Sequence, residues 1–328
     1  MTLHNYSQRV AIIGVTGYSG RELDGLLGGH PEIEVSGRFA SKADAKTGAE
    51  AFSLEKLRAA SPGVVVLATE HDLSHELVPQ LLEAGYRVLD MSGAFRLPEP
   101  SLYSDWYGFE HRAPGLLKES VYGLPEFYAD KIRKARLVAN PGCYATAAIL
   151  PLRPLYSAGV IDPAVPVVVD GKSGVSGAGR QPKPETHFCE VNENIRAYSV
   201  LRHRHTPEMI SQLPGASVDR FVFTPHLIPI TRGILCTIVF RSSGRAPAAA
   251  VLSEAYARAP FVEVLGPPAM PDVHSVFRTN ACRIGIAEHG ANTVMVSAID
   301  NLVKGAAGQA LQNLNLMLGC DPAAGISR

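Results

Sequence analysis

Apolar residues occur in short runs separated by glycine-rich or polar turns, and the connections between these runs differ in the two halves of the chain. In the first half, runs typical of buried strands cover residues 9–13, 33–39, 64–68 and 87–91. Helical stretches follow the first run, up to Leu27, and the third run, over residues 74–84. Alternating strands and helices predict a parallel, doubly wound sheet, so we expect an N-terminal α/β domain of Rossmann type.

The second half contains successive strand-like runs with few helices between them. These runs cover residues 165–170, 220–223, 234–240, 282–287 and 293–298. This pattern predicts a second, α+β domain with a mixed or antiparallel sheet. From Val303 to Leu318, apolar residues recur at helical spacing, which predicts one long amphipathic helix. We expect this helix to return to the first domain, giving domains of 1–142 plus 302–328 and of 143–301.

Composition narrows the possible partners. The 328 residues are 46% hydrophobic, and 31 basic residues balance 31 acidic ones. A net charge of zero gives no basic field for nucleic acid or an anionic membrane, which favours a small-molecule partner. Residues 1–8 are polar, and no stretch approaches the roughly 18 apolar residues of a membrane span. The five cysteines form no Cys-x-x-Cys pair, which indicates reduced thiols, no structural zinc site and a cytoplasmic location.

A glycine-rich loop follows the first strand-like run. Gly14, Gly17 and Gly20 recur at every third position, directly before a helical stretch. Glycines between a strand and a helix let the backbone approach a pyrophosphate, so the loop predicts a dinucleotide site. The predicted contacts are Gly14, Thr16, Gly17, Tyr18, Ser19 and Gly20. Because the spacing differs from Gly-x-Gly-x-x-Gly, a simple glycine-rich turn is the alternative.

The end of the second strand-like run indicates which dinucleotide binds. Enzymes that use NAD usually have an acidic residue there, which accepts a hydrogen bond from the ribose 2′-hydroxyl. This chain has Arg38, Ser41 and Lys42 instead. Hydroxyls and cations suit a 2′-phosphate, so the sequence favours NADP over NAD. The alternative is a solvated basic loop.

Cys143 lies where a turn, Asn140-Pro141-Gly142, is predicted to open into a helix. The free N–H groups and the positive dipole end of a helix start lower the pKa of a thiol and favour the thiolate. Cys143 is therefore a candidate nucleophile. An inert buried cysteine is the alternative.

A glycine-rich segment, residues 171–180, is the next candidate feature. Its small residues and the terminal guanidinium of Arg180 predict a nest for phosphate or carboxylate. Ser173 and Gly174 in this segment are candidate cofactor contacts. A flexible loop is the alternative. Near the end of the chain, the amide of Asn301 is a candidate contact for the carboxamide of the cofactor.

Two histidines, His203 and His205, directly precede Thr206 and Pro207, which resemble the N-cap and first residue of a helix. A histidine beside a thiol is the usual activator and proton carrier, although a lone histidine is more often structural. His71 and His75 are spaced to share a helix face, but the sequence suggests no third ligand, so we predict no metal site.

Taken together, these motifs resemble the N-acetyl-gamma-glutamyl-phosphate reductases, the arginine-biosynthesis family of the semialdehyde dehydrogenase group. The resemblance covers nearly the whole chain and comprises the Cys143 run and residues 14–20, 90–97, 122–126, 172–180, 190–198, 203–208, 223–228 and 298–318. Two stretches depart from the family pattern: Glu70-His71-Asp72 replaces Pro-His-Gly, and Leu201-Arg202 replaces Gly-Gly.

The resemblance implies a nucleophilic Cys143 with a histidine partner, for which we select His205, while His203 contacts the substrate. Arg96 and Arg180 are our candidates for holding the substrate's phosphate or carboxylate, since planar cations bind both in bidentate fashion. The expected activity is NADPH-dependent reduction of N-acetyl-gamma-glutamyl phosphate to the 5-semialdehyde through a thioester. The group also implies a homodimer or homotetramer.

Several functional alternatives remain at this stage. The same apparatus would reduce an aminoadipyl or aspartyl phosphate, because only the lining of the pocket distinguishes these substrates. A non-catalytic NADP-binding sensor and a Cys/His acyl hydrolase are more remote. The glycine loop argues against the hydrolase, and the joint presence of Cys143 and His205 argues against the sensor.

Overall fold

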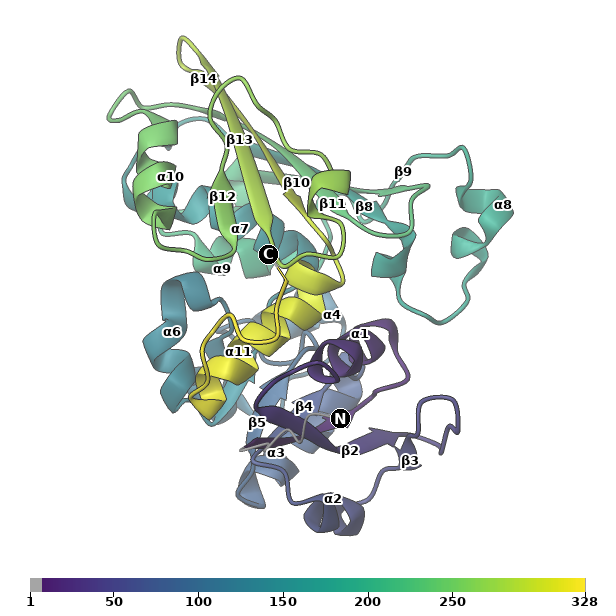
Figure 1. The fold of residues 1–328 in the computed structure, drawn as a ribbon. Coiled ribbons are helices and arrows are strands. Elements are labelled where there is room, and N and C mark those ends of the chain that lie inside the picture. Colours follow the sequence, from purple (N-terminus) through teal and green to yellow (C-terminus); the bar gives the residue numbers. More distant parts are fainter. Residues whose placement is uncertain (1–7, 328) are drawn as a thin grey trace. The chain divides into compact units, whose positions relative to one another are not determined.

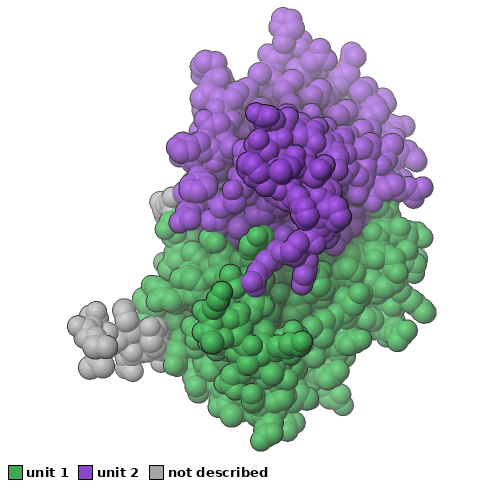
Figure 2. All heavy atoms as spheres, turned by 90° about the vertical axis from the view of Figure 1, so that its right-hand side faces the viewer, with its two compact units in different colours: residues 1–142, 306–327 green, residues 143–305, 328 purple. Residues whose placement is uncertain are grey.

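The computed structural model describes residues 8–327 and divides into two compact units. Unit 1 comprises residues 1–142 and 306–327, and unit 2 comprises residues 143–305 (Figure 2). The polar segment that we examined for an export signal lies, up to residue 7, outside the described residues. Among the described residues, no helix is long and apolar enough to cross a membrane.

Unit 1 is built on a seven-stranded parallel sheet in the order β3-β2-β1-β4-β5-β7-β6 (Figure 1). Its strands are β1 (Gln8–Ile13), β2 (Ile33–Ala40), β3 (Glu50–Ala51), β4 (Val64–Leu67), β5 (Arg87–Asp90), β6 (Val121–Tyr122) and β7 (Leu137–Ala139). The order reverses between β1 and β4, which is where open α/β sheets bind ligands. The predicted Rossmann-type domain is thus confirmed; the three shortest strands, β3, β6 and β7, were not predicted.

Helices cover both faces of this sheet because residues of β1 alternate between two apolar clusters. Val10 and Ile12 pack with residues of α1, α6 and α11, whereas Ala11 and Ile13 pack with residues of α2 and α3. The helices are α1 (Tyr18–Leu27), α2 (Leu54–Ala60), α3 (His71–Glu83), α4 (Ser101–Tyr107), α5 (Pro114–Glu119), α6 (Pro125–Lys134) and α11 (Gly308–Leu318). A parallel sheet with both faces buried explains its continuous apolar strands.

The last helix returns to unit 1, as predicted, but it is neither one regular helix nor amphipathic. A π-helical turn, Val303–Ala307, precedes α11, and every residue from Gly308 to Met317 is buried. Its polar side chains are hydrogen-bonded inside the unit: Asn313 donates to the Gly123 carbonyl (2.8 Å), and Asn315 bonds His30 (3.0 Å). Partners inside the unit, rather than water, therefore bind the amide groups of Asn313 and Asn315, at positions that the periodicity assigned to an exposed face.

Unit 2 contains a seven-stranded mixed sheet in the order β12-β13-β14-β11-β8-β10-β9, confirming the predicted α+β domain. Its strands are β8 (Val167–Gly174), β9 (Arg196–Ala197), β10 (Phe221–Ile228), β11 (Ile234–Arg241), β12 (Val262–Val264), β13 (Cys282–His289) and β14 (Asn292–Ile299). Strands β8 and β10 are parallel, as are β12 and β13, and the remaining pairs are antiparallel. Its helices are α7 (Cys143–Ser157), α8 (Phe188–Val191), α9 (His205–Gln212) and α10 (Ala248–Tyr256).

A row of four valines crosses the outer face of this sheet. Val222 pairs with Val168, Val168 with Val239, and Val239 with Val294, across β10, β8, β11 and β14. Val168 and Val239 are 37% and 40% exposed. The inner neighbours Val169 and Ile238 are fully buried, so the alternation places a second apolar stripe on the opposite face.

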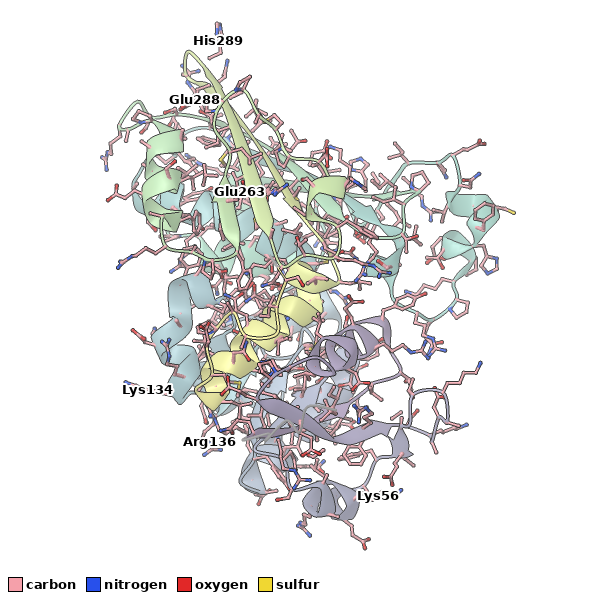
Figure 3. All side chains as sticks on the ribbon, viewed as in Figure 1. Lys56, Lys134, Arg136, Glu263, Glu288 and His289 are labelled. Atoms are coloured by element: carbon pink, nitrogen blue, oxygen red, sulfur yellow. The ribbon has the colours of Figure 1, made fainter. Side chains whose placement is uncertain are left out.

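Charged side chains of both signs lie on the surface of each unit. Figure 3 shows Lys56 and Lys134 pointing outward from unit 1, and Glu263 and Glu288 from unit 2; all four residues are exposed. The zero net charge thus reflects a surface on which both signs of charge are mixed.

Candidate active site

The glycine loop of unit 1 follows β1 at the point where the strand order reverses. Gly14 has φ +94°, and a Cβ there would lie 2.3 Å from the Ala68 carbonyl oxygen. A Cβ on Gly20 would lie 2.4 Å from the Gly14 oxygen. The N–H groups of Gly14 and Val15 donate to the Phe39 carbonyl (2.8 and 3.2 Å). Main chain packed on main chain thus fixes the loop, and only glycine fits at both positions.

The loop leads into α1 at Tyr18, with Gly17 as N-cap and no side-chain cap. Thr16 and Ser19 are half-buried beside it, and Tyr18 is 41% exposed. The first turn of a helix has N–H groups without intrahelical acceptors, and these groups attract anions. The glycine loop and this helix start therefore fit a dinucleotide pyrophosphate. A Cβ on the glycines would keep the pyrophosphate away from the backbone N–H groups.

The structure corrects our view of the ribose end of this site. Arg38, which we expected to bind a 2′-phosphate, donates instead from Nε to Asp24 of α1 (2.8 Å). Its Nη1 donates to the Val35 carbonyl (3.4 Å). Ser41 and Lys42 are exposed directly after β2. The cation of Arg38 is already neutralised, so these two residues are the better donors at the strand end.

Arg96, which we expected to hold the phosphate or carboxylate of the substrate, is hydrogen-bonded to the backbone instead. Its Nε donates to the Asn140 carbonyl (2.7 Å) and its Nη2 to the Met91 carbonyl (2.8 Å). The Asn140 side chain in turn bonds Ala306 and Asn313. These bonds hold the loop that leads to Cys143, so Arg96 acts on the geometry of that loop and has less capacity to clamp a substrate.

Cys143 is the first residue of α7 in unit 2, which is the predicted position at a helix N-terminus. The thiol is half-buried, and a Cβ on Gly305 would lie 2.7 Å from the Cys143 Cβ. The π-helical turn therefore passes directly against the cysteine, and Gly305 allows that approach. Departures from regular α-helix of this kind are frequent at functional sites.

A pair of tyrosines lies beside the cysteine. Tyr144 is buried, donates from its hydroxyl to the His226 carbonyl (2.9 Å), and is hydrogen-bonded to Tyr198. Burial raises the pKa of Tyr198 to about 12, so its phenol is neutral at physiological pH. Gly171 makes room for the Tyr144 ring on β8, since a Cβ there would lie 2.7 Å from it. The sequence analysis missed both tyrosines because nothing local links them.

The two predicted histidines lie together, with ring centroids 4.7 Å apart. His203 also packs edge-on against Tyr144 (5.7 Å) and Tyr198 (5.5 Å). Its Nδ1 accepts a hydrogen bond from the His205 backbone N–H (3.1 Å). Burial, with a smaller effect of Arg204, lowers the pKa of His203 to about 3. His203 is therefore a neutral imidazole whose Nε2 carries the proton.

His205 has a buried carboxylate as its neighbour. Its Nε2 lies 4.0 Å from Oε2 of Glu208, and the two side chains are 7% and 0% exposed. The ring nitrogen and the carboxyl group of this pair thus lie next to each other in a buried part of unit 2. The helix α9 begins at His205 itself, one residue before the N-cap that we predicted, because Pro207 is accommodated within the first turn. The i, i+3 spacing of His205 and Glu208 could have revealed this pair.

The predicted anion nest over residues 171–180 is wrong in its first half. Strand β8 continues to Gly174, and a 3₁₀ turn covers Val175–Ala178. A Cβ on Gly174 would lie 2.8 Å from the main chain of Arg232, and Ser173 is buried with its hydroxyl on the Gly174 carbonyl (3.0 Å). Pairing with β10 and β11 extends the strand despite its glycines. Arg180, which follows the turn, is exposed.

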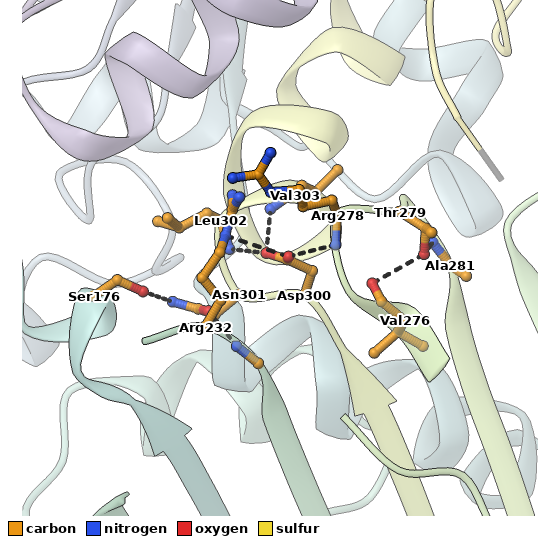
Figure 4. Close-up of polar contacts among 11 residues, drawn as sticks. Ser176, Arg232, Val276, Arg278, Thr279, Ala281, Asp300, Asn301, Leu302 and Val303 are labelled. Atoms are coloured by element: carbon orange, nitrogen blue, oxygen red, sulfur yellow. Dashed lines mark hydrogen bonds and ion pairs between the residues drawn. The ribbon is translucent and has the colours of Figure 1, made fainter. Parts of the chain in front are cut away.

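Asn301 is engaged within unit 2 (Figure 4). Its Oδ1 accepts from the Gly233 N–H (2.7 Å), and its Nδ2 donates to Ser176 (2.9 Å). Beside it, Asp300 accepts from the N–H groups of Arg278 and Leu302, both at 2.8 Å. Asn301 is 2% exposed, so it positions the turn at Ser176 rather than presenting a free amide to a cofactor.

The histidines considered as metal ligands have other contacts. His75 accepts from the Arg112 N–H (3.0 Å) and packs against His111, with ring centroids 4.5 Å apart. Within residues 8–327, no group of three or more His, Cys, Asp or Glu side chains is arranged to hold a metal ion.

The sequence matches two family models. Residues 9–135 match the NAD-binding domain of semialdehyde dehydrogenases, and residues 143–301 match their dimerisation domain. The N-acetyl-gamma-glutamyl-phosphate reductase of Magnetococcus marinus is 44% identical, with 95% of each chain covered. That of Neisseria gonorrhoeae is 40% identical, covering 97% of this chain and 96% of its own.

Solved structures show the same fold at low sequence identity. Aspartate semialdehyde dehydrogenase II of Vibrio cholerae has a TM-score of 0.70 at 19% identity, covering 95% of this chain and 98% of its own. The Candida albicans enzyme, solved with NADP, has a TM-score of 0.69 at 17% identity, with the same coverage. The chain belongs to the semialdehyde dehydrogenase family and, within it, to the N-acetyl-gamma-glutamyl-phosphate reductases.

Proposed function

We propose that this chain catalyses the NADPH-dependent reduction of N-acetyl-gamma-glutamyl phosphate to N-acetyl-glutamate 5-semialdehyde and phosphate, in arginine biosynthesis. The observation that carries the proposal is the cluster in unit 2, where Cys143 begins a long helix and the half-buried His203, the buried His205 and two tyrosines lie together. Relatives of that name, matching 95% of the chain, support the choice of substrate.

Cys143 is the nucleophile in this proposal. Its thiolate attacks the acyl carbon of the acyl phosphate, the bond between this carbon and the bridging oxygen breaks, and phosphate leaves with the electron pair of that bond. The product is a thioester on Cys143. NADPH, when bound, supplies the hydride that reduces this acyl carbon.

His205 is the acid/base group. After reduction, the tetrahedral oxygen re-forms its carbonyl while the carbon–sulfur bond breaks, and the aldehyde leaves. His205, beside Glu208, donates a proton to the oxygen of the tetrahedral intermediate and takes it back as the carbonyl re-forms and the thiolate leaves. His203, held neutral, donates from Nε2 to the substrate. Arg180, exposed after the 3₁₀ turn, is our candidate for the phosphate or carboxylate of the substrate.

The nicotinamide cofactor is NADP in this proposal. The loop from Gly14 to Gly20 would hold the pyrophosphate, and Ser41 and Lys42 would contact the 2′-phosphate. Ser173, which is buried, and Gly174, which packs on the Arg232 main chain, leave our set of cofactor contacts. No acidic residue stands between Phe39 and Ala43 to accept from a 2′-hydroxyl. The NADP in the Candida albicans relative is consistent with this choice.

We assign residues 1–142 plus 302–328 to NADP binding and residues 143–301 to catalysis and oligomerisation, a division within four residues of the boundary between the two units. The match to a dimerisation domain supports a homodimer or a homotetramer. The valine row on the outer sheet face is our candidate for the contact, since solvent-exposed apolar rows are rare without a partner. A biosynthetic enzyme of this kind would act in the cytoplasm.

Phosphate-dependent reduction of NADP⁺ by purified protein tests the proposal. N-acetyl-glutamate 5-semialdehyde is compared with aspartate and aminoadipate semialdehydes at equal concentrations. We expect kcat/KM to be at least about 100-fold higher for the acetylated substrate than for the other two, because a few contacts in the pocket can discriminate to this extent. A higher kcat/KM for either of the other two semialdehydes would mean that it belongs to the true substrate pair. Cofactor binding without turnover of any of the three would identify the protein as a sensor.

A further inference from the structure

A cavity of about 550 Å³ lies in unit 2, far from the cysteine. Its wall includes Tyr156 and Gly159 at the end of α7, Asp162 and Pro163 before β8, and Arg220 and Arg245 from two other connections. Helix α7 spans 15 residues from Cys143 to Ser157, a length of about 22 Å at 1.5 Å per residue. The cavity is thus at the opposite end of this helix and separate from the site described above.

Two guanidinium groups line this cavity without a protein partner. Within the described part of the chain, neither the Arg220 nor the Arg245 guanidinium makes an ion pair or a hydrogen bond, although most arginines of the chain do. Gly159 lets Arg245 approach closely, since a Cβ there would lie 2.7 Å from its Nη1. Both side chains are exposed, so an oxyanion between them would gain charge-assisted hydrogen bonds that water alone supplies in its absence.

The other polar groups of the wall agree with an anionic ligand. Burial raises the pKa of Tyr156 to about 12, so its hydroxyl is a donor at physiological pH. The one acid, Asp162, already accepts from the Ala164 N–H (2.9 Å), and its other oxygen lies 4.0 Å from Nε of Arg241. The carboxylate is therefore engaged outside the arginine pair.

We propose that this cavity binds a small organic anion, with its carboxylate or phosphate on Arg220 and Arg245 and its apolar body against Pro163 and Pro214. The volume lies within the 300–1,000 Å³ that is usual for small-molecule sites. Guanidinium groups bind both carboxylate and phosphate in bidentate fashion, so the shared chemistry is a planar or tetrahedral oxyanion.

Calorimetric titration of the full-length protein tests this site with two probes, glutarate for a carboxylate source and glycerol 3-phosphate for a phosphate source. We expect saturable binding of at least one probe, weakened at least about tenfold in Arg220→Ala/Arg245→Ala, as befits the loss of charge-assisted hydrogen bonds. Arg258→Ala, an exposed arginine outside the cavity, is the matched control and should bind as wild type.

Ala216→Trp provides a second variant, which fills the cavity while keeping both arginines. It should also abolish binding of the probe, and circular dichroism should show that each variant is folded. No saturable binding of either probe up to about 20 mM would overturn the proposal. So would binding that is unchanged in both cavity variants, because the probe would then occupy another site.

Discussion

The two units reach their functional sites by opposite means. In unit 1, the glycine loop is shaped by main chain on main chain, and Gly14 and Gly20 are there because any side chain would collide with a carbonyl. In unit 2, the cysteine lies among crowded side chains, with His203, His205 and Tyr144 in mutual contact. A site made of backbone should therefore be broken by adding atoms, and a site made of side chains by removing a functional group.

Removing the sulfur of Cys143 is the strongest test of the second half of this comparison. Cys143→Ser should lower kcat for acyl-phosphate reduction by about a thousandfold or more, because a serine hydroxyl is not ionised where a thiolate would be. NADP affinity, measured by fluorescence titration, should stay within about twofold. Cys189→Ser, an exposed cysteine, is the control. More than a tenth of wild-type turnover in the Cys143 variant would exclude it as the nucleophile.

The histidine pair separates two roles within the same cluster. His205→Asn should lower kcat by about a hundredfold or more, the usual contribution of general acid/base catalysis, with little change in KM. His203→Asn should mainly raise KM, since a neutral imidazole with pKa about 3 is not an acid near pH 7. Steady-state kinetics on both variants decide this, and the reverse result would exchange the two assignments.

Adding one methyl group should break the backbone site. Gly20→Ala places a Cβ 2.4 Å from the Gly14 oxygen, so we expect NADP affinity to fall at least about tenfold as the loop shifts. Gly25→Ala lies on the same helix with nothing within 4 Å, and should leave the affinity unchanged. Equal affinities for the two variants, measured by calorimetry, would show that the loop geometry does not govern cofactor binding.

Cofactor choice tests the one part of the unit 1 site that depends on side chains. With Ser41 and Lys42 after β2 and no acid there, NADPH should be used at least about tenfold more efficiently than NADH. Lys42→Ala should reduce this ratio, whereas Lys46→Ala, four residues further along, should not. Equal kcat/KM for the two cofactors in the wild type would refute our interpretation of this loop.

The smallest effect concerns a buried histidine of unit 1 that has no assigned part in the chemistry. Burial and the neighbouring His75 lower the pKa of His111 to about 4, while its Nε2 donates to the Ala94 carbonyl. In the unfolded chain its pKa is about 6.5, so unfolding takes up a proton below that pH. Above pH 6.5, His111 is neutral in both states and does not destabilise the fold. As the pH falls from 6.5 toward 4, the protonated imidazole stabilises the unfolded chain, so the free energy of unfolding decreases.

Urea unfolding at pH 7.5 and pH 5.0 measures this decline. Between pH 7.5 and pH 5.0, the free energy of unfolding of the wild type should fall by about 1–2 kcal/mol more than that of His111→Gln, whose side chain cannot titrate. An identical fall in the two proteins would show that His111 does not cause the pH dependence of stability. His203 is held neutral by the same burial, yet it packs against Tyr144, the residue after the cysteine, so one physical effect serves stability in unit 1 and chemistry in unit 2.

The sequence alone determined the features that depend on neighbours along the chain. The strand-like runs, the glycine spacing after β1 and the turn before Cys143 act over a few residues, so they identified the Rossmann-type sheet, the cofactor loop and the helix that begins at the cysteine. The contrast between strand-helix alternation and successive strands likewise separated the parallel sheet from the mixed one. The family resemblance then indicated the chemistry.

Only the tertiary structure decided how the polar side chains are used. Arg38 bonds Asp24, Arg96 bonds the Asn140 carbonyl, and Asn301 bonds Gly233, and each of these partners is 14 to 68 residues away along the chain. The buried face of α11 and the extension of β8 through its glycines also depend on such distant partners. A buried polar group must find a hydrogen bond, and local sequence does not specify where the fold will supply it.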